Sequence, residues 1–367
     1  MRIWHVYASN RLGPVNGVVQ SIHQLAAAQR AIGMDVHELH GTDDDPHHGP
    51  ASGTGRGLLR EAAALEAIAP PDLIHLHELF RPPHLRLRRQ LRRTPYVVTT
   101  HGATAAPNLA RYRWRKAAYG RGVERRLVRG ADALVALTIQ ERRDLYAWLP
   151  RAPEIRVIPN VADPTLLALP SWHPPAPDPH PRPTVVSLAR WDVRHKGLDR
   201  ISELATRLPS VSFAVHGAPC GNEPAALEGL RAAAPANFSL VPAVHGEAKI
   251  GAMRAASVFI LMSRWEGLAM ALLEAMALGL PCAVSEEVAA TLGHAAPVIR
   301  LPADADQAAT ALAAFIADEP RRRATGRAGR KWVRSMAAPE VIAAQTEELY
   351  RSVLTSTASD RRSRARR

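Results

Sequence analysis

The segment 257–281 constrains the fold of this chain more than any other. Its apolar run, residues 257–262, is typical of a buried strand in a parallel sheet. A loop that contains Glu266 follows, and the spacing predicts a helix over 270–278 that ends at Gly279. A strand, a loop and a helix in this order belong to an open α/β sheet, in which ligands bind at the carboxyl ends of the strands.

Two glutamates in this segment are candidates for ligand contacts. The N-terminus of the predicted helix offers unpaired N–H groups and the positive end of its dipole, which suit a phosphate. Glu266 precedes the helix, and Glu274 lies about a turn and a half along it, within reach of a ribose diol. The alternative is a surface glutamate followed by an ordinary amphipathic helix.

The pair Glu266 and Glu274, with seven residues between them and the run Ala-Met-Ala-Leu-Gly-Leu-Pro behind, resembles the signature of a known family. That family is the retaining GT-B glycosyltransferases of group 1, glycosyltransferase family 4. The resemblance implies that Glu274 holds the ribose of the donor and that Glu266 contacts the donor sugar. It also assigns donor contacts to the loop residues Gly267, Leu268, Ala269 and Met270, although the letters differ from those that the family often has.

The composition fits a globular protein of two domains. The chain has 367 residues, of which 47% are hydrophobic, and its apolar runs are too short to cross a bilayer. Met1 leads almost directly into an apolar strand pattern, so we expect no signal peptide. Cys220 and Cys282 are predicted to be free thiols in a reducing compartment, and the expected location is cytoplasmic.

Strands and helices alternate along both halves, which predicts two doubly wound parallel sheets. The predicted domains are an acceptor-side domain over 1–165, a Pro-rich linker over 166–183 and a donor domain over 184–338. A disordered basic tail is expected over 356–367. The resemblance implies a GT-B fold, with two Rossmann-like domains facing a central cleft and a last helix, 339–355, that returns to the first domain.

Cations follow the first strand of the second half. Arg190 and Lys196 bracket a strand-to-helix loop and are able to clamp a diphosphate, and both match family residues on the donor phosphates. Arg194 and His195 are neighbouring cations that compete with Lys196 for this role, and exposed loop charges are the structural alternative. Gly217 matches the family glycine before the loop that meets the nucleotide base.

The first half supplies weaker candidates. Gly13, Asn16 and Gly17 lie between the first strand and the first helix, where the family has a glycine loop, although an ordinary turn explains them equally well. His101 ends a predicted strand at the position of a family histidine that contacts the donor sugar; a core or capping histidine is the alternative. Thr138 and Asn160 follow other strands and are second-tier candidates.

No metal and no cofactor is expected. His75 and His77 share one face of a strand, but a metal would need a third ligand there. The cluster Asp43–Asp45 with His47 and His48 is more typical of a solvated loop.

The formal net charge of +13 is unevenly distributed. Segments 81–93, 111–129 and 361–367 together carry +18, so the remaining residues sum to −5. Such basic segments suit anionic lipid headgroups, while nucleic acid is disfavoured because no known binding motif is present. Arginines that simply solvate helix faces are the alternative.

The predicted function is therefore a retaining, metal-independent glycosyltransferase. It would move a sugar from a nucleoside-diphosphate sugar to a glycan or lipid-linked acceptor in polysaccharide or glycoconjugate biosynthesis, with a possible peripheral membrane location. A nucleotide-sugar epimerase, a phosphorylase with pyridoxal phosphate, and a non-catalytic nucleotide-sugar or polyanion-binding protein are the alternatives.

Overall fold

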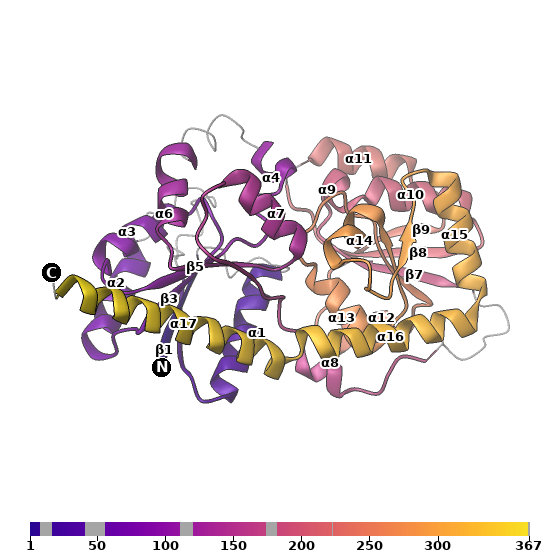
Figure 1. Cartoon of the computed structure of the whole chain (residues 1–367). Coiled ribbons are helices and arrows are strands. Elements are labelled where there is room, and N and C mark those ends of the chain that lie inside the picture. Colours follow the sequence, from indigo (N-terminus) through magenta and orange to yellow (C-terminus); the bar gives the residue numbers. More distant parts are fainter. Residues whose placement is uncertain (8–16, 41–55, 111–119, 174–181, 222, 366–367) are drawn as a thin grey trace. The chain divides into compact units, whose positions relative to one another are not determined.

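The computed structural model describes residues 1–7, 17–40, 56–110, 120–173, 182–221 and 223–365. These residues form two compact units (Figure 1). The first unit comprises Met1–Val161 and Pro339–Arg367, and the second comprises Ala162–Ala338. Predicted contacts at Gly13 and Asn16 and the cluster Asp43–Asp45 lie outside the described residues.

The first unit is built on a six-stranded parallel sheet in the order β2-β1-β3-β4-β5-β6. Its strands are β1 (Arg2–Tyr7), β2 (Asp35–His40), β3 (Leu73–His77), β4 (Tyr96–Thr99), β5 (Ala133–Ala136) and β6 (Ile155–Val157). Its helices are α1 (Gly17–Ala31), α2 (Arg56–Ile68), α3 (Pro82–Gln90), α4 (Ala106–Ala110), the π-helix η1 (Gly120–Glu124), α6 (Arg125–Arg129), α7 (Ile139–Trp148) and α17 (Pro339–Ala365).

The second unit repeats this design with the sheet order β12-β11-β10-β7-β8-β9, again entirely parallel. Its strands are β7 (Thr184–Leu188), β8 (Ser212–Gly217), β9 (Phe238–Pro242), β10 (Val258–Leu261), β11 (Cys282–Ser285) and β12 (Ile299–Leu301). Its helices are α8 (Pro164–Ala168), α9 (Val193–Lys196), α10 (Leu198–Arg207), α11 (Pro224–Ala233), α12 (Gly246–Arg254), α13 (Met270–Leu278), α14 (Glu286–Leu292), α15 (Ala305–Ala317) and α16 (Glu319–Ala337).

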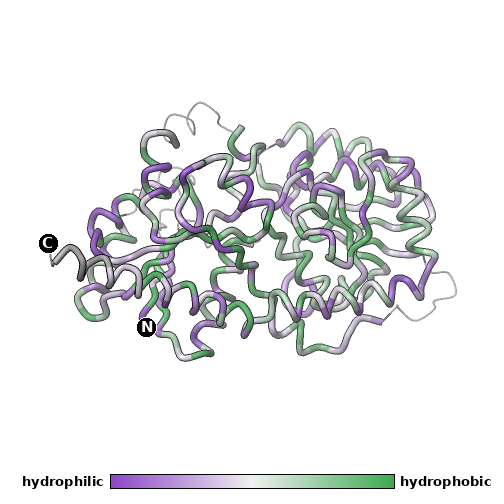
Figure 2. The backbone as a smooth tube through the Cα atoms, viewed as in Figure 1, coloured by the Kyte–Doolittle hydropathy of each residue, from purple (hydrophilic) through white to green (hydrophobic). Residues whose placement is uncertain are grey.

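Parallel strands need cover on both faces, and the burial pattern shows it. The strands β3, β4, β5, β10 and β11 are buried along their whole length. In the first unit one core cluster contains Trp4 and Leu87, and a second contains Ile3 and the α17 residue Tyr350. Figure 2 shows the hydrophobic segments gathered on the strands of each unit.

Helix α17 returns to the first unit and packs along α1. It extends to Ala365, so the expectation of a disordered tail from residue 356 differs from the structure. Thr357 donates to the Val353 carbonyl at 2.8 Å, as residues of a continuing helix do. A lack of apolar residues there removes packing but leaves good helix formers such as Arg and Ala.

The chain between the two units is also shorter than the expected linker of 166–183. Residues 164–168 form α8, and Trp172 is buried in the second unit, where its indole N–H donates to the Ala256 carbonyl at 3.0 Å. Prolines therefore mark the segment, but one aromatic side chain holds its first part against the second unit. The two units meet in sequence at Val161 and Ala162.

The described part of the chain contains no helix that is both long enough and apolar enough to cross a membrane.

Candidate functional site

The strand order of the second sheet identifies its ligand-binding edge. The chain progresses outward from β7 in one direction and from β10 in the other, so the winding reverses between these neighbouring strands. In open α/β sheets the crevice at such a switch point, beyond the carboxyl ends of the strands, is where ligands bind. Arg190 and Lys196 follow β7, while Glu266 and α13 follow β10. The sequence candidates therefore meet at this point.

The loop after β7 is built so that Lys196 faces the loop after β10. The Asp192 side chain caps α9 by accepting from the His195 N–H at 3.1 Å. Gly197 then turns the chain with φ 65°, and a Cβ at this position would lie 2.0 Å from the Met262 carbonyl oxygen. Only glycine permits this approach of the two backbones.

Lys196 and Glu266 form an ion pair, with Nζ 2.6 Å from Oε1. Both side chains are largely buried, at 14% and 9% exposure. Burial raises the pKa of Glu266, but the charge of Lys196 and a hydrogen bond from it leave that pKa below its ordinary value. Glu266 is therefore a carboxylate at neutral pH, and the pair places a cation and an anion side by side at the switch point.

The loop that carries Glu266 is fixed from both sides. Arg264 binds Asp199 with both ends of its guanidinium, at 2.9 and 2.6 Å. The His195 ring stacks on Trp265 with centroids 4.4 Å apart, and its Nε2–H donates to the Trp265 carbonyl at 3.0 Å. Burial lowers the pKa of His195 to about 4, with the Lys196 charge as the next cause. His195 is therefore a neutral positioning group and no substitute for Lys196.

Arg190 is the second cation of the β7 loop. Its side chain is exposed, and among the described residues it has no ion-pair partner. Gly217, at the end of β8, has no side chain, and this allows the neighbouring loop to lie close to it. A Cβ at this position would lie 1.9 Å from the Ala189 carbonyl oxygen. Gly217 thus sets the path of the chain through Arg190, and this role is independent of any contact with a base.

Helix α13 begins at Met270, as the sequence spacing predicts, and ends at Gly279 with φ 77°. Ala269 at its N-cap provides no side-chain hydrogen bond, so in the described chain the first-turn N–H groups lack a side-chain cap. The loop Gly267–Leu268–Ala269 leads into this N-terminus from β10. An anion at this position would be favoured by the helix dipole.

Glu274 has a partner that the sequence did not reveal. Its Oε1 accepts from Nζ of Lys249, on α12, at 2.7 Å, and the Glu274 side chain is 4% exposed. The two residues are 25 positions apart on different helices, a spacing that carries no sequence signal. Lys249 therefore fixes the carboxylate that was predicted to hold a ribose.

A double-mutant test separates the structural role of Glu274 from its predicted ribose contact. We expect Glu274→Gln to lower the free energy of unfolding by roughly 1–3 kcal/mol, because Lys249 keeps a largely buried charge without a carboxylate. Adding Lys249→Met should recover much of that loss in chemical denaturation. Donor binding should stay weakened in the double variant; its full recovery would contradict a direct contact of Glu274.

In the first unit His101 follows β4 in a left-handed conformation with φ 49°. The segment around it is anchored by Glu141, whose Oε1 accepts from the Thr100 hydroxyl and from the Gly102 N–H, both at 2.5 Å. Glu141 was not predicted from the sequence, although Thr138-Ile-Gln-Glu141 is a capping-box pattern. Thr138, a second-tier candidate, is the N-cap of α7 and accepts from the Glu141 N–H at 3.1 Å.

A small cavity adjoins these residues. Its volume is about 20 Å³, room for roughly one water molecule, and His77, His101 and Asn160 are among the residues that line it. Asn160, the other second-tier candidate, is buried at 8% exposure. Gly17 is the first residue of α1 and does not line this cavity.

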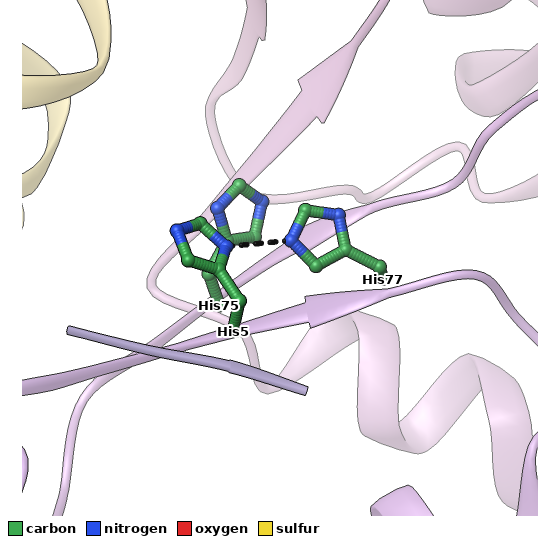
Figure 3. A group of neighbouring side chains, drawn as sticks. All are labelled: His5, His75 and His77. Carbon is green, nitrogen blue, oxygen red and sulfur yellow. Dashed lines mark hydrogen bonds between the residues drawn. The ribbon is translucent and has the colours of Figure 1, made fainter. Parts of the chain in front are cut away.

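Three buried imidazoles meet at the switch point of the first sheet, between β1 and β3 (Figure 3). His5 supplies a third ring, not predicted from the sequence, beside His75 and His77, and the ring nitrogens that could bind a metal lie within 4.8 Å of one another. All six ring nitrogens, however, take part in hydrogen bonds. A metal would have to displace several of these bonds, and the expectation of no metal stays a prediction.

The chain forms two parallel-sheet units, and in the second unit a cation and a carboxylate from two loops pair at the switch point; this architecture is that of the GT-B glycosyltransferases. Residues 16–161 match the glycosyl transferase 4-like domain, and residues 170–332 match the glycosyl transferases group 1. The chain belongs to this family of group 1 glycosyltransferases.

Individual relatives are consistent with this assignment. The chain is 27% identical to the alpha-maltose-1-phosphate synthase of Mycobacterium tuberculosis over 353 residues, covering 84% of this chain and 86% of the relative. Among solved structures, sucrose-phosphate synthase from Thermosynechococcus elongatus superposes with a TM-score of 0.76 at 21% identity, covering 97% and 99% of the two chains. Anabaena HepE in complex with UDP and glucose gives a TM-score of 0.70 at 15% identity, covering 96% and 100%.

Proposed function

We propose that this glycosyltransferase takes its sugar from a nucleoside-diphosphate sugar and transfers it with retention of the anomeric configuration. The observation that carries the proposal is the Lys196–Glu266 pair at the β7/β10 switch point, beside the exposed Arg190 and the uncapped N-terminus of α13. The complex of HepE with UDP and glucose supports a donor of this class.

Each residue of the site has a separate role in the proposed reaction. Arg190, Lys196 and the α13 dipole would stabilise the negative charge that develops on the leaving diphosphate. Glu266, held ionised by Lys196, would accept hydrogen bonds from sugar hydroxyls, and Glu274 would bind the ribose diol. Because protein cations supply the charge, we propose that the reaction needs no divalent metal. His101 of the first unit would contact the donor sugar.

A phosphorylase is disfavoured by the placement of the lysines. Such an enzyme needs a lysine to anchor pyridoxal phosphate, whereas Lys196 and Lys249 in the second unit are held by glutamates. The remaining lysine of the second unit, Lys331, is exposed on α16. The family description likewise favours transfer over an epimerase or a non-catalytic binding protein.

The test is to offer a panel of nucleoside-diphosphate sugars to the purified chain and to measure released nucleoside diphosphate. We expect slow hydrolysis of one donor, faster turnover once a glycan or lipid-linked acceptor is added, and little change with EDTA. Glu266→Gln should depress turnover. If no donor of the panel is cleaved with any acceptor, or if activity is lost with EDTA, the proposed reaction fails.

We further propose that the acceptor is reached at an anionic membrane surface. In the first unit, α3, the residues after it and α6 carry the exposed arginines Arg86, Arg89, Arg92, Arg93, Arg126 and Arg129. Both helices are held by buried leucines of one core cluster, including Leu87 and Leu127. Other arginines of these segments are structural, since Arg88 stacks on the Tyr96 ring at 3.9 Å and donates to two carbonyls. The aromatic and basic residues within 111–119 lie outside the described residues.

Vesicle sedimentation tests this surface. Each arginine near an anionic membrane contributes roughly 1 kcal/mol, so reversing Arg89 and Arg92 to Glu should weaken binding to anionic vesicles by at least about 30-fold. Arg327→Glu, on the exposed side of α16 in the second unit, is the matched control and should bind nearly as the wild type does. Binding should fade at high salt. Equal binding to neutral and anionic vesicles would contradict the proposal.

A further inference from the structure

A chain of hydrogen bonds runs through the first unit from α17 to His101. Gln29 of α1 donates from Nε2 to the hydroxyl oxygens of Thr346 and Tyr350, both at 3.1 Å. Its Oε1 lies 2.7 Å from Nε2 of His5. The chain continues from His5 Nδ1 to His77 Nε2 at 2.8 Å, the contact drawn in Figure 3, and from His77 Nδ1 to His101 Nε2 at 3.0 Å.

Thr346 on α17 determines which atom donates and which accepts along this series of hydrogen bonds. The Thr346 hydroxyl donates to the Ala343 carbonyl at 3.0 Å, so toward Gln29 its oxygen acts as an acceptor. The amide nitrogen of Gln29 must therefore face Thr346, and its carbonyl oxygen must face His5. An acceptor at this point requires that His5 carries its proton on Nε2.

The tautomer of each ring then determines the tautomer of the next, because a neutral imidazole has one donor and one acceptor nitrogen. His5 Nδ1 accepts, so His77 is protonated on Nε2; His77 Nδ1 accepts, so His101 is protonated on Nε2. These donor and acceptor roles require that the rings of His5, His77 and His101 are neutral, and their lowered pKa values meet this requirement. Burial lowers the pKa of His5 and of His101 to about 4 and lowers the pKa of His77 well below its ordinary value.

We propose that Thr346, Gln29, His5 and His77 form a positioning relay that locks His101 as its Nε2–H tautomer and presents Nδ1 as a hydrogen-bond acceptor. His101 is only partly buried, and its Nδ1 makes no hydrogen bond to any described residue. The acceptor nitrogen thus remains available at the carboxyl end of β4. The value of this arrangement for a sugar hydroxyl rests on the donor contact proposed above.

His75 supports the relay from the side. Tyr350 already accepts from Gln29, so its own O–H donates to His75 Nδ1 at 2.6 Å, and His75 Nε2–H donates to the Thr99 hydroxyl oxygen at 2.6 Å. His75 is therefore also an Nε2–H tautomer. A structure in which all four rings share one tautomer is a specific consequence that packing alone does not require.

The test is nitrogen NMR of the ligand-free full chain labelled with ¹⁵N-histidine, which distinguishes protonated from unprotonated ring nitrogens. We expect His5, His75, His77 and His101 to be protonated on Nε2 and unprotonated on Nδ1 at pH 7.5. A His101 protonated on Nδ1 in the wild type would overturn the relay. So would zinc bound stoichiometrically to His5, His75 and His77, since the metal would occupy relay nitrogens.

Gln29→Met tests whether the amide group of Gln29 determines the tautomer of His101 through the two intervening rings. Methionine offers His5 neither a strong acceptor nor a donor, so we expect His101, two rings away, to show both tautomers. Ser21→Ala is the matched control. Ser21 lines the small cavity that His77 and His101 also line, but its hydroxyl donates to the Val18 carbonyl, which is outside the relay. A pure Nε2–H signal of His101 in Gln29→Met would contradict the relay.

The kinetic readout is separate from the spectroscopic one. Once a donor is known, Gln29→Met should lower kcat/KM in proportion to the lost population of the Nε2–H tautomer of His101, about twofold for an equal mixture, while Ser21→Ala should leave it unchanged. The spectrum needs no donor, so failure of the relay and failure of the donor contact are distinguishable. An unaltered kcat/KM with mixed tautomers would refute only the sugar contact of His101.

Discussion

Replacing Lys196 by Met is expected to lower kcat by about 10²–10³, the usual loss when one group that stabilises developing charge is removed. The change keeps the apolar stem of the side chain but removes the ammonium that lies 2.6 Å from Glu266. It also leaves Glu266 buried without its closest cation. The measurement is steady-state and single-turnover kinetics with the donor identified by the panel.

Arg194→Met is the matched control for Lys196→Met. Arg194 lies two positions earlier in α9 and has an exposed side chain. Its backbone N–H donates to Glu223 and its carbonyl accepts from Arg264, so the substitution leaves both hydrogen bonds in place. We expect activity close to that of the wild type. Equal losses in both variants would show that α9 contributes only general positive charge.

The chain should lose stability steeply as the pH falls from about 6.5 toward 4. His5, His75, His77 and His84 are at most 1% exposed, and burial lowers the pKa of each, to about 4 for His5 and His84. A lowered pKa means that the unfolded chain binds the proton first, so this stability is present above 6.5 and is lost on acidification. Each group contributes roughly 1.4 kcal/mol per pH unit.

Two buried carboxyl groups oppose this trend, because burial raises the pKa of Glu141 as well as that of Glu124. Burial raises the pKa of Glu124 to about 7, so its contribution is present at low pH and is lost as the pH rises from about 4.5 to 7. Burial also lowers the pKa of His101 and of His195 to about 4, which brings the set to six histidines, so against two carboxyl groups the net slope should be that of about four to five histidines, or ~6 kcal/mol per pH unit. Urea unfolding between pH 7.5 and 5 measures it. A free energy of unfolding that stays flat over this range would contradict the buried neutral set.

His84→Leu isolates a single member of that set. Both ring nitrogens of His84 are buried without a hydrogen-bond partner in the described structure, so leucine removes two unsatisfied atoms as well as one titrating group. We expect the variant to be more stable than the wild type at pH 5 and its slope to fall by roughly 1.4 kcal/mol per pH unit. An unchanged slope would show that His84 titrates normally.

The sequence predicted most of the second-unit site because its signals are local. The β10 apolar run, Glu266, the start of α13 and Glu274 follow one another within a single strand-loop-helix unit. The parallel-sheet order then brings the β7 loop beside it without further information. The predicted helix bounds of 270–278 agree with α13 for the same reason.

The missed residues act across the fold. Lys249 reaches Glu274 from another helix, and His5 reaches His77 from a strand 72 positions away. No spacing rule connects such pairs, because sheet pairing and helix packing decide which side chains meet. Glu141 is different: its capping-box pattern was visible in the sequence, but its bonds to Thr100 and Gly102 depend on the neighbouring strand.

The measurement that tests the central claim most directly is calorimetric titration of nucleoside diphosphates into the wild type, Arg190→Ala and Lys196→Met, with Arg194→Met as the control. The claim is that the cations at the β7/β10 switch point bind the donor diphosphate. We predict that one diphosphate binds the wild type and the control alike. Arg190→Ala and Lys196→Met should each lose at least about tenfold in affinity, since a charge-assisted hydrogen bond contributes about 1.5–3 kcal/mol. Equal affinity in all four proteins would contradict the claim.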